Sequence, residues 1–322
     1  MITVNLRARY AIYGGMIGDS LGSSLEFTNS TNAKNLITKY SNFDNGLIGK
    51  GPFDLCSGQI TDDSEMALAI MFVISQNGEY NQEITAKIYH MWYNSHPFDI
   101  GNTTQIAVSN PTYDKMIQAS RKLNATSLSN GFLMRLYGLV AMYYGKSSED
   151  LINAIIKDVE LTHSHPEVKE IAVIYGMMLY KAIRNENADR IYQWGKNHCS
   201  KSKLVFALYN TVDNYQTSFV YNNETYDISH IDSKNTGFVG FAFWLLLQAI
   251  KNHRSYRDAI LEVVGYGGDT DTNACIVGAV IGALYPDTIP TKWIESLLNC
   301  SAKKRYINYP IADPKVWSKW LP

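Results

Sequence analysis

The sequence lacks the cysteine spacing, the basic clusters and the long apolar runs that mark several protein classes. Its four cysteines, at positions 56, 199, 275 and 300, include no CxxC pair, so neither a zinc knuckle nor a thiol redox motif is indicated. A formal net charge of −1 gives no electrostatic footprint for binding extended nucleic acid. The one short basic run, residues 303–305, is therefore interpreted as solvated surface.

No signal peptide or membrane-spanning segment is predicted either. The first residues carry Asn5, Arg7 and Arg9 instead of an apolar core. The longest apolar stretch, residues 236–250, has about 15 residues where roughly 20 are needed to cross a bilayer, so a buried core helix is expected there. We therefore expect a cytoplasmic monomer with no membrane partner.

Helical periodicity dominates what is present, and alternating strand patterns are scarce. Helices are predicted over residues 6–22, 62–76, 82–95, 101–122, 132–145, 148–160, 166–186, 236–251, 256–265, 271–284 and 291–300. Asp62 and Glu65 have the spacing of a capping box. A short hairpin is predicted around Asn222 and Asn223, from strands at 218–221 and 225–228. No repeat or linker divides the chain, so we predict one all-α domain over residues 1–322.

Two acidic clusters about 200 residues apart each precede an apolar helix. One lies within residues 58–66 and the other within residues 265–273. Their oxygen-bearing side chains are Thr61, Asp62, Asp63, Asp269, Asp271 and Thr272. Each cluster alone has a capping interpretation, because Asp and Thr are favoured N-caps and the helix dipole stabilises negative charge there. Neighbouring carboxylates exceed what a cap requires, however, and they repel one another unless cations neutralise them.

The donor atoms of both clusters are all oxygen, which favours a hard cation such as Mg²⁺, Mn²⁺ or Ca²⁺ over zinc. Glu26 falls at the exit of the first predicted helix, where it could reach the same centre. With Glu26, the ionised carboxylates would carry about five negative charges, and two divalent ions would bring the site close to neutral. The charge therefore favours a pair of metal ions over one.

Taken in order, these segments resemble the ADP-ribosylglycohydrolases, the family that includes the dinitrogenase reductase-activating glycohydrolases. The similarity runs from Tyr10 to about Tyr285 through residues 18–26, 58–68, 98–104, 129–135, 162–166, 236–246 and 267–284. The resemblance implies an orthogonal all-α bundle around two Mg²⁺ or Mn²⁺ ions. It implies metal ligation by Thr61, Asp62, Asp63, Asp269, Asp271 and Thr272. Glu26 matches an acidic residue that contacts a metal or positions the attacking water.

The resemblance also implies substrate-binding residues. The segment Ser129, Asn130, Gly131, Phe132, Leu133, Met134 and Arg135 matches a loop that enters a helix, where backbone N–H groups could meet a pyrophosphate. The alternative is an ordinary helix start with Arg135 in an ion pair. His163, with Thr162, matches a substrate-contacting pair, although a capping Thr and a surface His remain open. Asp99 matches an acidic position that assists catalysis, and an N-cap role is the alternative.

These expectations define a hydrolase that cleaves the glycosidic bond at C1 of the distal ribose of ADP-ribose, with Glu26 or Asp99 moving the proton. Its partner would be an ADP-ribosylated protein, with arginine linkage favoured, or an ADP-ribose-like small molecule. Two alternatives stay open: a catalytically silent ADP-ribose-binding protein, and a binuclear hydrolase of another ribosylated substrate, serine-linked or small. Residues 28–57 and 200–235 show no family pattern and are expected to shape the mouth of the site.

Overall fold

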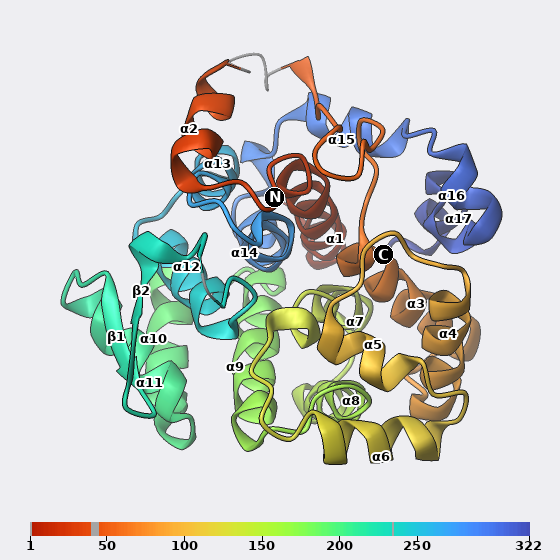
Figure 1. Cartoon of the computed structure of the whole chain (residues 1–322), viewed down its shortest axis with the longest axis horizontal. Coiled ribbons are helices and arrows are strands. Elements are labelled where there is room, and N and C mark those ends of the chain that lie inside the picture. The colour runs from red at the N-terminus through yellow and green to blue at the C-terminus, as the bar shows by residue number, and fades with distance from the viewer. Residues whose placement is uncertain (1, 40–44, 234) are drawn as a thin grey trace.

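The computed structural model describes residues 2–39, 45–233 and 235–322, and helices make up most of it (Figure 1). The α-helices are α1 (Val4–Gly22), α2 (Ser30–Lys39), α3 (Asp62–Asn77), α4 (Gln82–Asn94), α5 (Asn102–Val108), α6 (Tyr113–Leu123), α7 (Leu136–Met142), α8 (Ser148–Glu160), α9 (Pro166–Ile183), α10 (Ala188–His198), α11 (Lys203–Asp213), α12 (Val239–Lys251), α13 (Tyr256–Val264), α14 (Thr270–Leu284), α15 (Thr291–Leu298), α16 (Lys303–Asn308) and α17 (Pro314–Trp317). Strands β1 (Ser218–Tyr221) and β2 (Glu224–Asp227) pair antiparallel. The predicted all-α class and the predicted hairpin are confirmed. None of the described helices combines the length and apolar character needed to span a membrane.

Several predicted boundaries were wrong for local reasons. The helix expected over 101–122 is divided into α5 and α6, with Pro111 between them, because a proline lacks the N–H that a continuous helix needs. The helix expected over 132–145 begins only at Leu136, after a 3₁₀ turn. Residues 28–57 and 200–235, where no helix was predicted, contain α2 and α11, and residues 40–44 lie outside the described part of the chain.

Helices α1 and α14 lie side by side at the centre of the molecule (Figure 1). Gly14, Gly18 and Gly22 recur every four residues on α1, which places them on the face turned toward α14. A Cβ atom at Gly18 would lie 2.1 Å from the backbone oxygen of Ala274, so the two backbones approach too closely for any side chain there. This close approach fixes the start of α14 against the end of α1.

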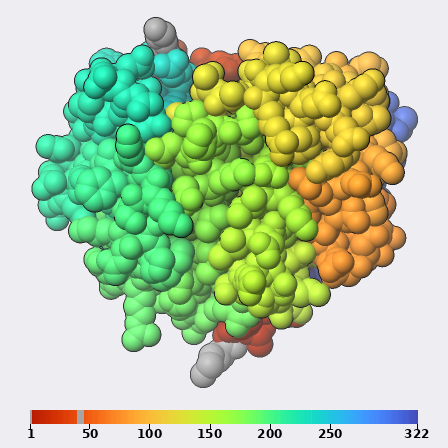
Figure 2. Space-filling view, turned by 90° about the horizontal axis from the view of Figure 1, so that it is seen from below, coloured from red at the N-terminus to blue at the C-terminus, as the bar shows by residue number. Residues whose placement is uncertain are grey.

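The middle of the chain covers this central pair from one side. In Figure 2 the visible face consists mainly of segments coloured orange to teal, while the N-terminal and C-terminal segments appear only at its edges. Every residue of α14 is buried, which explains its apolar sequence after the first turn. Its acidic first turn is consequently a set of carboxylates inside the protein.

A buried ion pair connects α3 to the C-terminal helices. Arg305 Nε donates to Glu65 Oε1 at 2.7 Å, and Trp92 Nε1 donates to Glu65 Oε2 at 2.7 Å. Two predictions are corrected by this contact. Glu65 does not complete a capping box, and Arg305 is buried instead of lying on a solvated surface with Lys303 and Lys304. Removing either partner would leave an uncompensated charge in the interior.

Candidate active site

The acidic clusters meet at the first turns of α3 and α14, beside the exit of α1. They border a cavity of about 750 Å³, within the range of roughly 300–1,000 Å³ usual for small-molecule sites. The oxygen-bearing side chains of the predicted machinery that line it are Glu26, Asp62, Asp99, Asp269, Asp271 and Thr272. Thr61 and Asp63 are fully buried behind this wall. The tertiary structure thus brings together residues from both acidic clusters.

Capping does not account for these carboxylates. The N-cap residues of α3 and α14 are Thr61 and Asp269, and neither makes a side-chain capping hydrogen bond. The free N–H groups of α3 are instead satisfied by Asp19 of α1, whose carboxylate accepts from Thr61 N at 3.1 Å and from Ser64 N at 3.2 Å. Because α1 supplies the cap, the carboxylate of Asp62 and the Oδ1 atom of Asp63 remain available for other partners, while Asp63 Oδ2 lies 2.9 Å from the Thr61 hydroxyl.

The sequence interpretation assigned no role to Asp19, although it lies in the segment 18–26 that carries the family resemblance. It also accepts from the Thr61 hydroxyl at 2.9 Å. Thr61 and Asp19 are separated by 42 residues, so local spacing gives no sign of the contact. The available sequence signal was an acidic residue inside an otherwise apolar, glycine-rich helix, where a carboxylate needs a buried partner.

The cluster has the character of a cation site. One carboxylate oxygen each from Glu26, Asp269 and Asp271 lie within 4.8 Å of one another. Within the described part of the chain, Glu26 Oε2 and Asp63 Oδ1 are buried and accept no hydrogen bond. Burial, together with the neighbouring carboxylates, raises the pKa of Glu26 to about 10 and holds those of Asp62, Asp63 and Asp271 well above their usual range. An all-oxygen set with unpartnered acceptors fits a hard divalent ion.

Asp99 lies on the same cavity wall. The N-cap of α5 is Gly101, so the alternative in which Asp99 caps that helix is wrong. Burial and the charge of Asp269 raise the pKa of Asp99 to about 6. Asp99 is therefore an acidic group that faces the cavity and is coupled to the carboxylate cluster.

The segment 129–135 is only partly exposed to the cavity. Ser129, Asn130, Gly131 and Met134 line it, and Asn130 Nδ2 donates to Asp269 Oδ2 at 2.8 Å. The segment begins as a 3₁₀ turn, and the N–H of Asn130 is not free, because it donates to the Gly237 carbonyl. This bond between Asn130 and Asp269 nevertheless ties the segment directly to α14.

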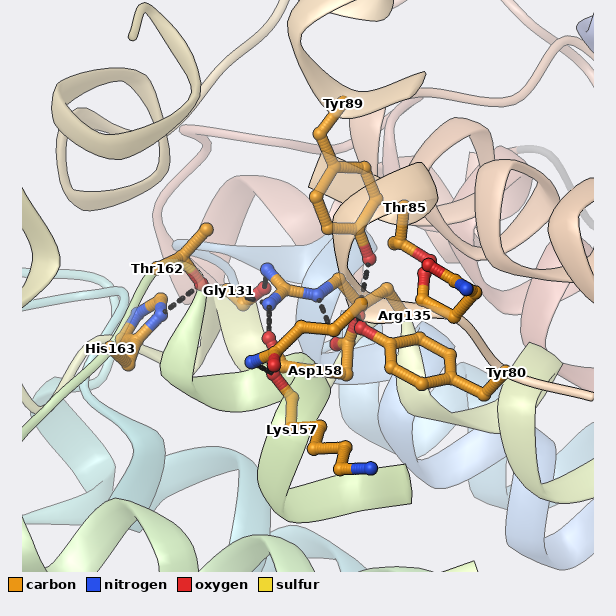
Figure 3. A network of polar contacts seen from close by, with 11 residues as sticks. Tyr80, Thr85, Tyr89, Gly131, Arg135, Lys157, Asp158, Thr162 and His163 are labelled. Atoms are coloured by element: carbon orange, nitrogen blue, oxygen red, sulfur yellow. Dashed lines mark hydrogen bonds and ion pairs between the residues drawn. The ribbon is translucent and has the colours of Figure 1, made fainter. Parts of the chain in front are cut away.

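Three members of the segment, Phe132, Leu133 and Arg135, are fully buried and do not line the cavity, which corrects the expectation that they contact a substrate. Arg135 Nε donates to Asp158 Oδ2 at 2.8 Å, so the ion-pair alternative describes it (Figure 3). His163 is also fully buried, neither on the surface nor on the cavity wall. Their side chains lie beneath the segment and support it.

Aromatic residues that no motif indicated form further parts of the cavity wall. Tyr226 of β2 and Phe238 stack with their ring centroids 4.4 Å apart. Phe27, directly after Glu26, lines the cavity with 66% of its surface exposed. The hairpin thus contributes to the site through Tyr226, which lies in residues 200–235 where the sequence showed no family pattern. Phe238 lies in the segment 236–246 that carries the resemblance.

Fold and site together define an all-α enzyme whose acidic cluster could bind metal ions. The family model for the ADP-ribosylglycohydrolases matches residues 2–317 of this chain. The chain therefore belongs to the ADP-ribosylglycohydrolase family, and it is a hydrolase that acts on ADP-ribosyl bonds.

Individual relatives agree with this assignment. A protein of Acanthamoeba polyphaga mimivirus, named provisionally as an ADP-ribosyl glycohydrolase, is 53% identical over 326 residues that cover 99% of each chain. The ADP-ribosyl-[dinitrogen reductase] glycohydrolase of Rhodospirillum rubrum is 25% identical, covering 92% of this chain and 91% of its own. An ADP-ribosylarginine hydrolase of Pseudomonas putida is 24% identical, with coverages of 90% and 74%. A solved ADP-ribosylglycohydrolase-related protein shares the fold over 99% of both chains, with a TM-score of 0.72 and 22% identity.

Proposed function

We propose that this protein is a metal-dependent hydrolase that removes ADP-ribose from arginine side chains of proteins. The observation that carries the proposal is the meeting of Glu26, Asp269 and Asp271 within 4.8 Å at the wall of a ligand-sized cavity. The Rhodospirillum and Pseudomonas relatives, whose names specify ADP-ribosylated dinitrogen reductase and ADP-ribosylarginine, support the choice of substrate class.

Two Mg²⁺ or Mn²⁺ ions would be held by Glu26, Thr61, Asp62, Asp63, Asp269, Asp271 and Thr272. When bound, such ions would supply Lewis-acid chemistry at ribose hydroxyls and a lowered pKa of a bound water. Asn130 holds the Asp269 carboxylate in place through its 2.8 Å hydrogen bond. Asp19 holds the start of α3, which orients Asp62 and Asp63 without using their oxygens.

The bond that breaks joins C1 of the distal ribose to the guanidinium nitrogen. The C1–N bond breaks as water adds to C1. Glu26, which bound cations would keep ionised, accepts the proton of the water and passes it to the departing nitrogen, so that arginine is released. Asp99 is the second candidate for this proton transfer, because it faces the same cavity. Free ADP-ribose and an unmodified arginine are the products.

The remaining cavity wall suits the two ends of the substrate. Tyr226 and Phe238, whose stacked rings line the cavity, would contact the adenine. Phe27 offers an exposed ring beside Glu26, where the leaving group must depart. A guanidinium is planar and cationic and stacks on aromatic faces, which is why arginine linkage is favoured over serine linkage.

The decisive measurement is release of free ADP-ribose from arginine-ADP-ribosylated protein, with Mg²⁺ or Mn²⁺ and with EDTA. We expect release only with metal. Asp269→Asn or Asp62→Asn should abolish turnover while the thermal unfolding curve stays close to that of the wild type. Asp258→Asn, the same change in the exposed first turn of α13, is the matched control and should keep full activity.

Other outcomes select among the alternatives. Release from serine-linked but not arginine-linked substrate would replace the acceptor in the proposal. Binding of ADP-ribose without turnover of any linkage would favour the catalytically silent binding protein. A wild-type rate in the Asp269→Asn variant would show that the acidic cluster takes no part in the reaction.

A further inference from the structure

A chain of buried hydrogen bonds runs from an ion pair in the interior to the cavity wall. Figure 3 shows its members from Arg135 to His163. Arg135 Nη2 donates to Thr162 Oγ1 at 2.8 Å, and Thr162 Oγ1 lies 2.8 Å from His163 Nδ1. His163 Nε2 lies 2.9 Å from the hydroxyl oxygen of Ser129, which lines the cavity. Arg135, Thr162 and His163 are all fully buried, so water does not compete for these contacts.

The donor and acceptor of each hydrogen bond in this series follow from Arg135, its first member. A guanidinium only donates, so Thr162 Oγ1 must accept from Arg135. Among the described residues, the Thr162 hydroxyl has one further polar partner, His163 Nδ1. If Nδ1 also donated to it, the hydroxyl proton would be buried without an acceptor, at a cost of about 1–3 kcal/mol. Thr162 therefore donates to Nδ1, and Nδ1 carries no proton.

The same reasoning determines which atoms donate and accept at His163 and Ser129. Burial and the nearby Arg135 charge lower the pKa of His163 well below its usual range, so the ring is neutral. With Nδ1 as acceptor, the single ring proton sits on Nε2 and is donated to Ser129 Oγ. The Ser127 hydroxyl, at 3.3 Å, is a second and longer donor to the same oxygen. The proton of Ser129 itself is left to point into the cavity.

We propose that Arg135, Thr162 and His163 are positioning residues that hold the Ser129 hydroxyl as a hydrogen-bond donor toward a phosphate oxygen of the ligand. The inference rests on the proposed function, whose substrate contains a pyrophosphate. It also explains why His163 need not touch the ligand. The fixed ion pair with Asp158, which accepts from Tyr89 at 2.8 Å as well, gives the chain a rigid starting point.

The charge of the cavity wall makes this donor important. None of the described residues that line the cavity is a lysine or an arginine, whereas five are carboxylates besides Glu224. A pyrophosphate must therefore be bound by neutral donors, and each hydroxyl contributes only if its proton points toward the ligand. Phosphate oxygens only accept, so a serine fixed as a donor matches them, while a freely rotating hydroxyl would be ordered at an entropic cost.

The test uses the full chain with ¹⁵N-labelled histidine. The tautomer of His163 is read from its ring ¹⁵N shifts, with the signal assigned by its loss in His163→Gln. We expect a neutral ring protonated at Nε2. A proton at Nδ1, or a charged ring at neutral pH, would overturn the proposal. This measurement needs no turnover, and the affinity measurements on the Thr162 variants test the same arrangement if His163→Gln does not fold.

Affinity measurements complete the test. Thr162→Val removes the donor to Nδ1 with little change of shape and should weaken ADP-ribose binding about tenfold while leaving adenosine binding unchanged. Thr162→Ser keeps the hydroxyl and should restore wild-type affinity. Equal loss for ADP-ribose and adenosine, or no loss for either, would contradict the positioning role. ADP-ribose binding that responds in the predicted way, without hydrolysis of any linkage, would support this inference while the proposed function fails.

Discussion

A carboxylate in the first turn of a helix can either cap that helix or bind something else, and this protein divides the two uses between residues. Asp19 reaches from α1 to the backbone N–H groups of Thr61 and Ser64. Asp63 Oδ1 is consequently left without a hydrogen-bond partner among the described residues. An unpartnered buried acceptor costs stability unless a ligand satisfies it, so its presence at the cluster supports cation binding.

Phe27 is the residue whose environment is hardest to explain by folding alone. It has a φ of 60°, in a region that non-glycine residues seldom adopt, and its ring is largely exposed. Its backbone N–H donates to the Gly268 carbonyl at 2.9 Å, which holds the conformation. The strained backbone and the exposed ring are both located beside Glu26, which points to a functional use of the ring.

We expect Phe27→Leu to lower kcat/KM on arginine-linked substrate by about 3- to 30-fold, because a cation on an aromatic face is worth roughly 0.5–2 kcal/mol. The loss on serine-linked substrate should be smaller, since that leaving group carries no cation. Steady-state kinetics on the two linkages measure the difference. Phe206→Leu, on α11 and 55% exposed, is the matched control. An equal loss on both linkages would show that the ring does not select the acceptor.

At the scale of elements, the contact between α1 and α14 determines the geometry of the site. Thr270 Oγ1 donates to the Gly22 carbonyl at 2.7 Å, at the point where both helices meet the cavity. A Cβ at Gly22 would lie 2.4 Å from the backbone oxygen of Thr270, so side chains are excluded along the whole contact. The glycines thus set how near Asp271 comes to Glu26.

Gly18→Ala should therefore destabilise the protein by about 1–3 kcal/mol or more, because its Cβ would meet a backbone oxygen that cannot move independently. Urea unfolding followed by circular dichroism measures the change. Gly145→Ala serves as the control, since a Cβ there meets no atom within 4 Å. Loss of less than 1 kcal/mol in Gly18→Ala would show that the two helices can separate without cost.

At the scale of the whole molecule, the buried carboxylates make stability depend jointly on pH and metal. Burial raises the pKa of Asp19 to about 7, so the folded state binds its proton more tightly than the unfolded state does. The stabilisation from such a group is complete below the unfolded pKa of about 4 and is lost as the pH rises through about 7. Glu26, with a pKa of about 10, acts in the same direction.

We therefore expect the rise in Tm produced by Mg²⁺ or Mn²⁺, relative to EDTA, to be larger at pH 8 than at pH 5. Metal ions must displace the carboxylate protons at the lower pH, and they relieve charge repulsion at the higher one. Comparing metal with EDTA at each pH cancels the opposite contribution of His163, whose pKa is lowered. A metal-induced shift that does not change with pH would contradict this account.

The monomeric state, the cytoplasmic location and the single domain over residues 1–322 stay predictions. The buried apolar side chains of the described residues form one cluster that extends from Ala8 to Trp317, which is compatible with one domain. Gel filtration with light scattering would determine the oligomeric state directly.

The sequence by itself determined the helical class, the hairpin and the two acidic helix starts, because periodicity, turn residues and N-terminal acidic residues act within a few positions of one another. The resemblance to the ADP-ribosylglycohydrolases was also confirmed. It could be recognised from the sequence because the family pattern consists of short segments, each of which is visible locally. Helices α10 and α11 were not predicted, although each has a buried apolar face and a capping residue, Asn187 and Ser202, that the sequence displays.

Only the tertiary structure decided which side chains reach the cavity. Arg135 pairs with Asp158 and Glu65 with Arg305, so three charged residues that had been assigned other roles, Arg135, Glu65 and Arg305, are held in the interior. Asp19 caps a helix that begins 42 residues later, and no local rule predicts that contact. Partners separated by tens or hundreds of residues are chosen by the packing of all helices together, whereas sequence patterns report only the preferences of each helix alone.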